Sequence, residues 1–302
     1  MKILITGAIS WNEEQKEKLK HMGHEILYVQ DERISLREQG IDVEDLEGVI
    51  CNGLFLYNDI SEFCNLKYVQ LTSAGFDRVP LDYIREHQIE IHNARGVYSI
   101  PMAEFALCGV LQLYKQSRFF YENQKNHEWK KHRNMMELAG KTVCILGCGS
   151  VGTECAKRFK VFGCQVTGVD LYPRMDENYD DMVSLENLEK ILPESDIVIL
   201  TLPLTDETQH LMNEGRLGLL KAGAIFVNIA RGAIVDMKAL INALPNLGGA
   251  VLDVFEEEPL GEDSPLWEME NVIITPHNSF VGEGNRDRLW KVILDNLNGW
   301  RR

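Results

Sequence analysis

Short apolar runs alternate with amphipathic segments along residues 1–98. Apolar residues at helical spacing among charged ones predict helices at residues 13–21, 59–64 and 81–87. Runs rich in Ile, Leu, Val and Tyr predict strands at residues 2–6, 25–29, 48–51, 68–72 and 89–92. Strands that alternate with helices need crossover connections, so this pattern predicts a parallel sheet covered by helices.

A second series of the same kind begins at Pro101, which can occupy the first turn of a helix. Apolar residues recur at helical spacing from Phe105 to Tyr114, so one face of this helix is expected to be buried. A helix is also predicted at residues 152–162, and a tail helix at residues 287–300. Apolar runs predict six strands, at residues 142–146, 165–169, 196–200, 224–228, 249–253 and 271–275.

The two series predict an α/β protein with two doubly wound parallel-sheet domains. The hinges are expected near residues 99 and 280, and the tail helix is expected to return to the first domain. The first domain would then comprise residues 1–98 and 281–302, and the second would comprise residues 99–280. A chain of 302 residues is long enough for two substantial cores.

Composition narrows the possible partners. The net charge of −15 argues against nucleic acid or an anionic membrane as the main partner. Seven cysteines without a CxxC pair favour free thiols in a reducing cytoplasm over a disulfide framework. No apolar run approaches the ~18 residues that a membrane span needs. His21 and His24 have no third ligand nearby in the sequence, so no metal site is predicted.

The segment TVCILGCGSVG at residues 142–152 has the glycine spacing of a dinucleotide-binding turn. Gly147, Gly149 and Gly152 follow a predicted strand and open a predicted helix. In such a turn the first glycine allows a tight bend, the second lets the backbone approach a pyrophosphate, and the third lets helix pack on strand. The free N–H groups at the helix start would then face the phosphates.

Asp170 ends the next predicted strand, close to the position of an acidic partner for the adenosine ribose, roughly 20 residues on. A carboxylate there repels a 2′-phosphate, which favours NAD over NADP as the cofactor. A tight turn in an unrelated α/β protein, or a site for another nucleotide, is the alternative interpretation of these glycines.

Three polar residues follow buried-looking strands: Arg231 after IFVNIA, Glu258 after VLDVFEE and His277 after VIITP. Ligands of open α/β sheets bind beyond the carboxyl ends of the strands. The set suits reduction of a 2-keto acid, because an arginine can hold the carboxylate and polarise the ketone. The imidazolium can donate the proton, and the carboxylate can orient the ring. Taken singly, the alternative interpretations are a surface turn residue for Arg231, a solvated acidic run for Glu258 and a strand cap for His277. The joint occurrence of the three residues favours the catalytic interpretation.

Ser73, Ala74 and Gly75 end a predicted strand of the first domain. Backbone N–H groups in such a turn can bind a carboxylate. An ordinary glycine-containing turn is the alternative interpretation.

At this point the sequence resembles the D-isomer-specific 2-hydroxyacid dehydrogenase family, which includes D-lactate, glycerate and phosphoglycerate dehydrogenases. The resemblance covers nearly the whole chain. It is carried by the glycine loop with Asp170 and by six further segments: TSAGFD (72–77), PMAEFAL (101–107), LPLTDET (202–208), KAGAIFVNIARGAIVD (221–236), VLDVFEEEP (251–259) and PLWEMENVIITPH (265–277).

The resemblance implies a Rossmann NAD-binding domain, a flavodoxin-like substrate domain, a cleft between them and a homodimer formed mainly through the nucleotide domains. It makes Arg231 the substrate-binding arginine, His277 the acid/base and Glu258 its partner, with Ala74 and Gly75 on the substrate carboxylate. It implies that the cofactor is bound by Gly147, Gly149, Ser150, Val151, Gly152, Asp170, Pro203, Ala230, Asp253 and His277.

The expected activity is NAD-dependent interconversion of a small 2-keto acid and its D-2-hydroxy acid. Asn278, Ser279 and Phe280 follow His277, where the family usually has small residues including glycine. This departure puts the expected pocket wall beside the nicotinamide in question. Two alternatives stay open: an NAD-sensing, corepressor-like binding protein of the same family, and a dehydrogenase of the same fold for another substrate, such as formate.

Overall fold

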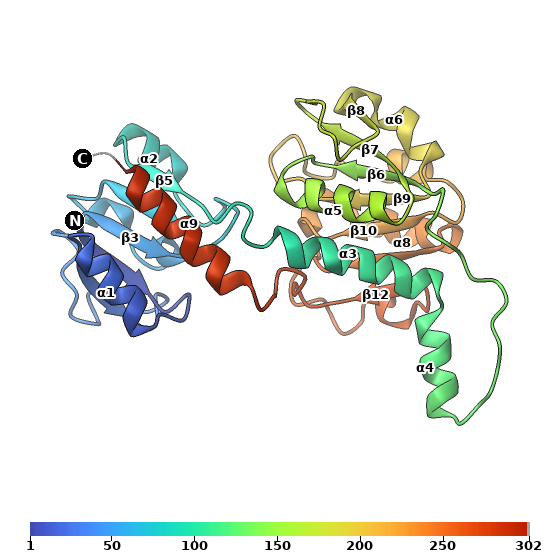
Figure 1. Cartoon of the computed structure of the whole chain (residues 1–302), viewed down its shortest axis with the longest axis horizontal. Helices are drawn as coiled ribbons and strands as arrows, with labels where there is room; N and C mark the ends of the chain where they lie inside the picture. Colours follow the sequence, from blue (N-terminus) through green and yellow to red (C-terminus); the bar gives the residue numbers. More distant parts are fainter. Residues whose placement is uncertain (301–302) are drawn as a thin grey trace. The chain divides into compact units, whose positions relative to one another are not determined.

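The computed structural model describes residues 1–300 and divides the chain into two compact units (Figure 1). Unit 1 comprises residues 1–98 and the segment from residue 282 onward, and unit 2 comprises residues 99–281. Each unit contains one parallel sheet with helices on both faces. The predicted fold class, α/β with two doubly wound parallel sheets, is therefore confirmed.

The sheet of unit 1 has five parallel strands in the order β2-β1-β3-β4-β5. This is the flavodoxin-like order, in which the chain moves first to one side of β1 and then to the other. The strands are β1 (Lys2–Thr6), β2 (Glu25–Val29), β3 (Gly48–Cys51), β4 (Tyr68–Leu71) and β5 (Glu90–His92).

Two helices cover one face of this sheet: α1 (Glu13–His21) and the tail helix α9 (Asn285–Gly299). Leu289, Ile293 and Leu297 of α9 are buried at helical spacing in the cluster that contains Ile3 and Ile5 of β1. The other face is covered by α2 (Leu81–Glu86) and by the long connections that follow β2 and β3.

The sheet of unit 2 has seven parallel strands in the order β12-β11-β10-β9-β6-β7-β8. Its first six strands in sequence follow the Rossmann order, and β12 extends the sheet at the edge next to β11. The strands are β6 (Thr142–Leu146), β7 (Gln165–Asp170), β8 (Asp181–Ser184), β9 (Ile197–Leu200), β10 (Ile225–Asn228), β11 (Gly249–Leu252) and β12 (Val272–Ile274).

Two helices, α3 (Ser99–Tyr114) and α5 (Ser150–Val161), pack on one face of this sheet. Gly109 allows the close approach of α3, because a Cβ there would lie 2.7 Å from Cγ1 of Val251 in β11. The opposite face is covered by α6 (Leu188–Ile191), α7 (Glu214–Gly218) and α8 (Met237–Ala243).

Local predictions failed where the apolar signal was weak. Residues 59–64 form only a single 3-10 turn, η2 (Ile60–Glu62), instead of a helix. Two elements were missed: β8, which has no fully buried residue, and α4 (Ser117–Lys125), which extends away from the body of unit 2 (Figure 1). In residues 1–300, no helix is long and apolar enough to span a bilayer.

Candidate functional site

The carboxyl ends of the parallel strands in unit 2 bring most of the predicted site residues to one edge of the sheet. In strand order from the edge, His277 follows β12, Asp253 follows β11, Arg231 follows β10 and Pro203 follows β9. The glycine loop follows β6, and Asp170 is the last residue of β7. Every strand from β12 to β7 thus contributes a predicted residue to this edge.

The glycine loop is closed by contacts that only glycine permits. Gly147 has a φ of +95°, and a Cβ there would lie 2.8 Å from the backbone nitrogen of Leu202. A Cβ at Gly152 would lie 2.1 Å from the carbonyl oxygen of Gly147, so the start of α5 packs directly on the turn. The Thr201 hydroxyl donates to the same carbonyl oxygen at 2.6 Å and fixes the turn from the side of β9.

The other side of the loop has room for a ligand. A Cβ at Gly149 would meet no atom within 4 Å, although Gly147 and Gly152 on either side are tightly packed. Ser150 is the first residue of α5, and no side chain caps the N-terminus of this helix. Free N–H groups beside an open glycine form a cradle for a phosphate, so the loop fits a dinucleotide.

Asp170 and Cys148 complete this cradle. The Asp170 carboxylate accepts N–H bonds from Cys148 at 2.8 Å and from Tyr172 at 3.1 Å, which ties the end of β7 to the glycine loop. Burial raises the pKa of the Cys148 thiol to about 12. The thiol is therefore neutral near pH 7 and adds no negative charge beside the phosphate cradle.

The turn that carries Arg231 is shaped by a buried amide. Asn228, the last residue of β10, accepts from the Ala230 N–H at 3.0 Å and donates to the Arg231 carbonyl at 3.1 Å. Arg231 in turn donates from Nη1 to the Ala230 carbonyl at 2.8 Å. A Cβ at Gly232 would lie 1.9 Å from the Phe255 carbonyl, so the arginine turn packs on the turn that leads to Glu258.

Glu258 and His277 form the pair that the sequence predicted to act together. Glu258 Oε2 lies 2.9 Å from His277 Nδ1, and both side chains are partly exposed. Glu258 Oε1 accepts from the Phe255 N–H at 3.0 Å, which fixes the other carboxylate oxygen. The carboxylate therefore contacts one ring nitrogen of His277 and leaves Nε2 for another partner.

The turn of His277 is held by one buried carboxylate. Asp253 is fully buried and accepts from the Thr275 hydroxyl at 2.6 Å and from the N–H groups of Asn278 and Ser279 at 2.7 and 2.9 Å. The His277 N–H donates to the Asp253 carbonyl at 2.8 Å. His277 itself has a φ of +51°, a left-handed conformation that bulky residues rarely adopt without such fixed neighbours.

Phe280 lies beside His277, where the resemblance predicted a small residue. The ring of Phe280 lies 6.1 Å from the imidazole of His277, edge to face at 82°. An aromatic side chain therefore borders the imidazole where a small residue was expected from the resemblance.

Ala74 and Gly75 lie in unit 1, after β4. Asn93 Nδ2 donates to the Ala74 carbonyl at 2.6 Å, and the Ser73 hydroxyl donates to the Gly75 carbonyl at 3.0 Å. Within residues 1–300, neither the Ala74 N–H nor the Gly75 N–H has a hydrogen-bond acceptor. The carbonyls of the turn are thus held while two adjacent N–H groups stay available for an anion.

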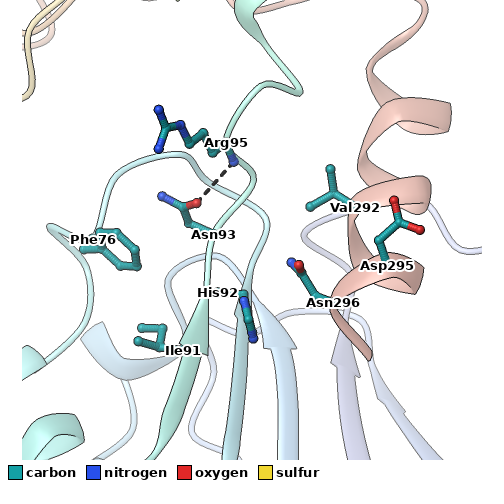
Figure 2. Close-up of a pocket in the computed structure, with 8 residues that line it drawn as sticks. All are labelled: Phe76, Ile91, His92, Asn93, Arg95, Val292, Asp295 and Asn296. Carbon is teal, nitrogen blue, oxygen red and sulfur yellow. Dashed lines mark hydrogen bonds between the residues drawn. The ribbon is translucent and has the colours of Figure 1, made fainter. Parts of the chain in front are cut away.

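A pocket of about 360 Å³ opens at the free edge of β5 in unit 1 (Figure 2). It contains none of the predicted site residues, although Asn93 connects it to the Ala74 turn. Its lining comes from β5, the segment after it, Phe76 and α9: Phe76, Ile91, His92, Asn93, Arg95, Val292, Asp295 and Asn296.

Several residues that shape the site were not identified from the sequence. Asn228, Thr201 and Thr275 are polar groups that end or follow an apolar strand, and each binds the backbone or side chain of a neighbouring turn. A single polar residue at the end of an apolar run was the available signal. Thr208 also belongs here, because its hydroxyl donates to the Pro203 carbonyl at 2.8 Å and closes the loop after β9.

Known proteins resemble this chain over most of its length. A family model described as D-isomer specific 2-hydroxyacid dehydrogenase, NAD binding domain, matches residues 107–279. A glyoxylate reductase from Korarchaeum cryptofilum is 35% identical over 78% of this chain and 74% of its own length. An (S)-sulfolactate dehydrogenase from Chromohalobacter salexigens is 32% identical over 88% of this chain and 87% of its own length. The crystal structure of a D-lactate dehydrogenase from Aquifex aeolicus complexed with NAD and lactic acid has a TM-score of 0.77 at 26% identity, and the match covers 99% of this chain and 95% of that one.

Replacing Asp253 by Asn tests how the His277 turn is held. Asn keeps the size of the side chain, but its NH₂ group replaces one carboxylate oxygen of Asp253. A donor that binds this oxygen in the wild type would then face a second donor, so one buried hydrogen bond is lost. The free energy of unfolding of Asp253→Asn should fall by about 1–3 kcal/mol. Urea unfolding measures the change, and the exposed Asp263→Asn is the matched control. Equal stability of the two variants would show that the carboxylate does not hold this turn.

Proposed function

Because this chain belongs to the D-isomer-specific 2-hydroxyacid dehydrogenase family, an enzyme family with an NAD-binding domain, we propose that it interconverts a small 2-keto acid and its D-2-hydroxy acid by hydride transfer. The observation that carries the proposal is the joint geometry at the edge of unit 2. An arginine turn packs on the turn of a carboxylate that contacts a histidine, beside a glycine loop that fits a dinucleotide.

In the proposed reaction, NADH held by the glycine loop would supply a hydride, and the side chains of this chain bind the keto acid and move the proton. The guanidinium of Arg231 binds the substrate carboxylate and polarises the ketone. His277, protonated, donates its proton from Nε2 to the carbonyl oxygen, and in the reverse direction it takes that proton from the hydroxyl. Glu258, through Nδ1, orients the ring and stabilises its charged form.

The cofactor is assigned to the edge of unit 2. Gly149 gives the backbone room for a pyrophosphate, while Gly147 allows the tight turn and Gly152 lets α5 pack on it. The N–H groups of Ser150 and Val151 at the start of α5 would bind the pyrophosphate. Asp170 accepts hydrogen bonds from the adenosine ribose and repels a 2′-phosphate, which favours NAD over NADP. Pro203, Ala230 and Asp253 border the nicotinamide side.

Unit 1 is the proposed substrate domain and unit 2 the proposed dinucleotide domain. The available N–H groups of Ala74 and Gly75 bind the substrate carboxylate. The relatives named glyoxylate reductase and sulfolactate dehydrogenase support a short 2-keto acid as the substrate. The presence of the arginine, glutamate and histidine side chains together at this edge favours an enzyme over a cofactor-sensing binding protein.

A direct assay tests the proposed activity. Oxidation of NADH should be measured with glyoxylate, hydroxypyruvate, pyruvate, branched 2-keto acids and 3-phosphohydroxypyruvate, and at least one is expected to turn over. His277→Ala should lower kcat by about 10²–10⁴-fold and leave NADH binding intact, because only the proton transfer is removed. Arg231→Ala should mainly raise KM. Near-wild-type turnover of His277→Ala would show that another group is the proton donor.

Glu258→Gln tests the support of His277 in the same assay. The amide keeps the size of the side chain but removes the negative charge beside the His277 ring, so kcat should fall while the Kd for NADH stays unchanged. A wild-type kcat in Glu258→Gln would remove Glu258 from the proposed mechanism.

Gly149→Val tests the cofactor cradle by NADH fluorescence titration. A Cβ at residue 149 would meet no atom within 4 Å, so the variant should keep the thermal stability of the wild type. The side chain fills the space assigned to the pyrophosphate, so NADH affinity should fall more than about tenfold, which corresponds to ~1.4 kcal/mol. Gly218→Val, at another open glycine, is the control and should bind NADH normally. Unchanged NADH affinity in Gly149→Val would contradict the assignment of the pyrophosphate to the glycine loop. In the same titration, the wild type should bind NADH more tightly than NADPH.

The chain is also proposed to form a cytoplasmic homodimer through unit 2. Leu107, Leu111 and neighbouring residues line an apolar depression on α3, and Trp129, in the segment that extends beyond α4, is 98% exposed. The basic residues around Trp129 suit a second copy of an acidic chain. Sedimentation of the wild type should give twice the 34.5 kDa mass of one chain. The mass measured for Trp129→Asp should fall toward that of a single chain. A monomeric wild type would contradict this assembly.

A further inference from the structure

A second histidine–carboxylate pair lies next to the first, because its glutamate, Glu256, comes two residues before Glu258. His210 Nε2 lies 2.5 Å from Glu256 Oε1, whereas His277 contacts Glu258. His210 comes from the loop after β9, and Glu256 from the turn after β11. None of the roles assigned above involves this pair.

The peptide between Phe255 and Glu256 is the point at which three turns meet. The Phe255 N–H binds Glu258 Oε1, and the Phe255 carbonyl and the Glu256 nitrogen contact Gly232 in the arginine turn. The second carboxylate oxygen of Glu256 accepts from the Met237 N–H, the first residue of α8, at 3.2 Å. A displacement of Glu256 would therefore reach both the arginine turn and the Glu258 carboxylate.

His210 is itself held in place from the backbone. Its N–H donates to the Ala233 carbonyl at 2.8 Å, and two residues later the Met212 N–H donates to the Ile234 carbonyl at 3.0 Å. The loop after β9 thus runs beside the segment that follows Arg231. The same loop begins at Thr201, whose hydroxyl binds the glycine turn.

The histidines of these two pairs have left-handed backbone conformations, with φ of +47° at His210 and +51° at His277. A bulky residue adopts this conformation at a cost, and such residues are concentrated where the direction of a side chain matters. At His210 the conformation directs Nε2 to Glu256 while the N–H bond to Ala233 is kept.

We propose that His210 is a positioning residue, which holds Glu256 and thereby keeps the Phe255–Glu258 turn in the geometry that places Glu258 on Nδ1 of His277. The proposal rests on the function assigned above to His277 and Glu258. Since both members of the pair are partly exposed, their contact adds little to global stability. Loss of this contact is expected to change the tautomer of the His277 ring and to lower kcat, with little effect on the free energy of unfolding.

Two substitutions at residue 210 separate the contact from the fold. Asn tolerates the left-handed conformation but is too short to place a donor where Nε2 lies. Gln places an amide donor near that position, and this chain already accommodates Gln at φ +54° at residues 88 and 116. His210→Asn should therefore break the contact with Glu256, and His210→Gln should restore it.

The first measurement is independent of turnover. Long-range ¹H–¹⁵N spectra report which ring nitrogen of neutral His277 carries the proton, and the contact with Glu258 favours Nδ1–H. His210→Asn should shift the His277 ring toward the Nε2–H form, and His210→Gln should return it to the wild-type form. The second measurement is kinetic: His210→Asn should lower kcat about fivefold with the Kd for NADH unchanged, and His210→Gln should regain most of the loss.

The control is His92→Asn. His92 forms an exposed pair with Glu90 in unit 1, at 2.7 Å, and should change neither readout. If His210→Asn does not fold, Glu256→Ala breaks the same contact from the other side and is assessed in the same way. A wild-type His277 tautomer and wild-type kcat in the contact-breaking variant would overturn the proposal. Absence of turnover in the wild type would instead refute the proposed function, while the tautomer would still test the role of His210.

Discussion

The candidate site depends on the register of the three parallel strands β10, β11 and β12. Asn228 lies opposite Leu252, and Leu252 lies opposite Ile274, so the three strands end level with one another. Because parallel strands point the same way, the residues that follow all emerge at one edge. Arg231 and His277 each come three residues after such an end, although 46 positions separate them in sequence. A slip of one residue in this pairing would turn the side chains of a strand to the opposite face of the sheet.

Buried polar groups then convert this common edge into a defined arrangement. Asn228 shapes the arginine turn, Asp253 shapes the histidine turn, and Thr201 fixes the glycine loop. Each of these side chains satisfies backbone groups that would otherwise be left without partners in the interior. The side chains proposed to react are more exposed than the side chains that hold their turns, as His277 and Asp253 illustrate. The buried side chains thus make the turns rigid, and the exposed side chains remain available to contact a ligand.

Much of this was predictable from the sequence because apolar runs and glycine spacing are local signals. The strands of both sheets were identified wherever four or five buried residues follow one another, as in β6 and β9. The weak strand β8 and the polar helix α4 lack that signal, because few of their residues are buried. The contact between Glu258 and His277 was expected from their chemistry and from the family. The role of Asp253 as the anchor of the histidine turn was not, because it depends on a loop that begins 22 residues later.

Gly232 shows how much can depend on one absent methyl group. Because Gly232 has no side chain, the backbone of the arginine turn packs directly against the backbone of Phe255 and Glu256. Any larger residue would act as a wedge, and the strands beneath, which do not include this position, would keep their pairing. A substitution here is therefore expected to move the turn of Arg231 away from the turn that leads to Glu258.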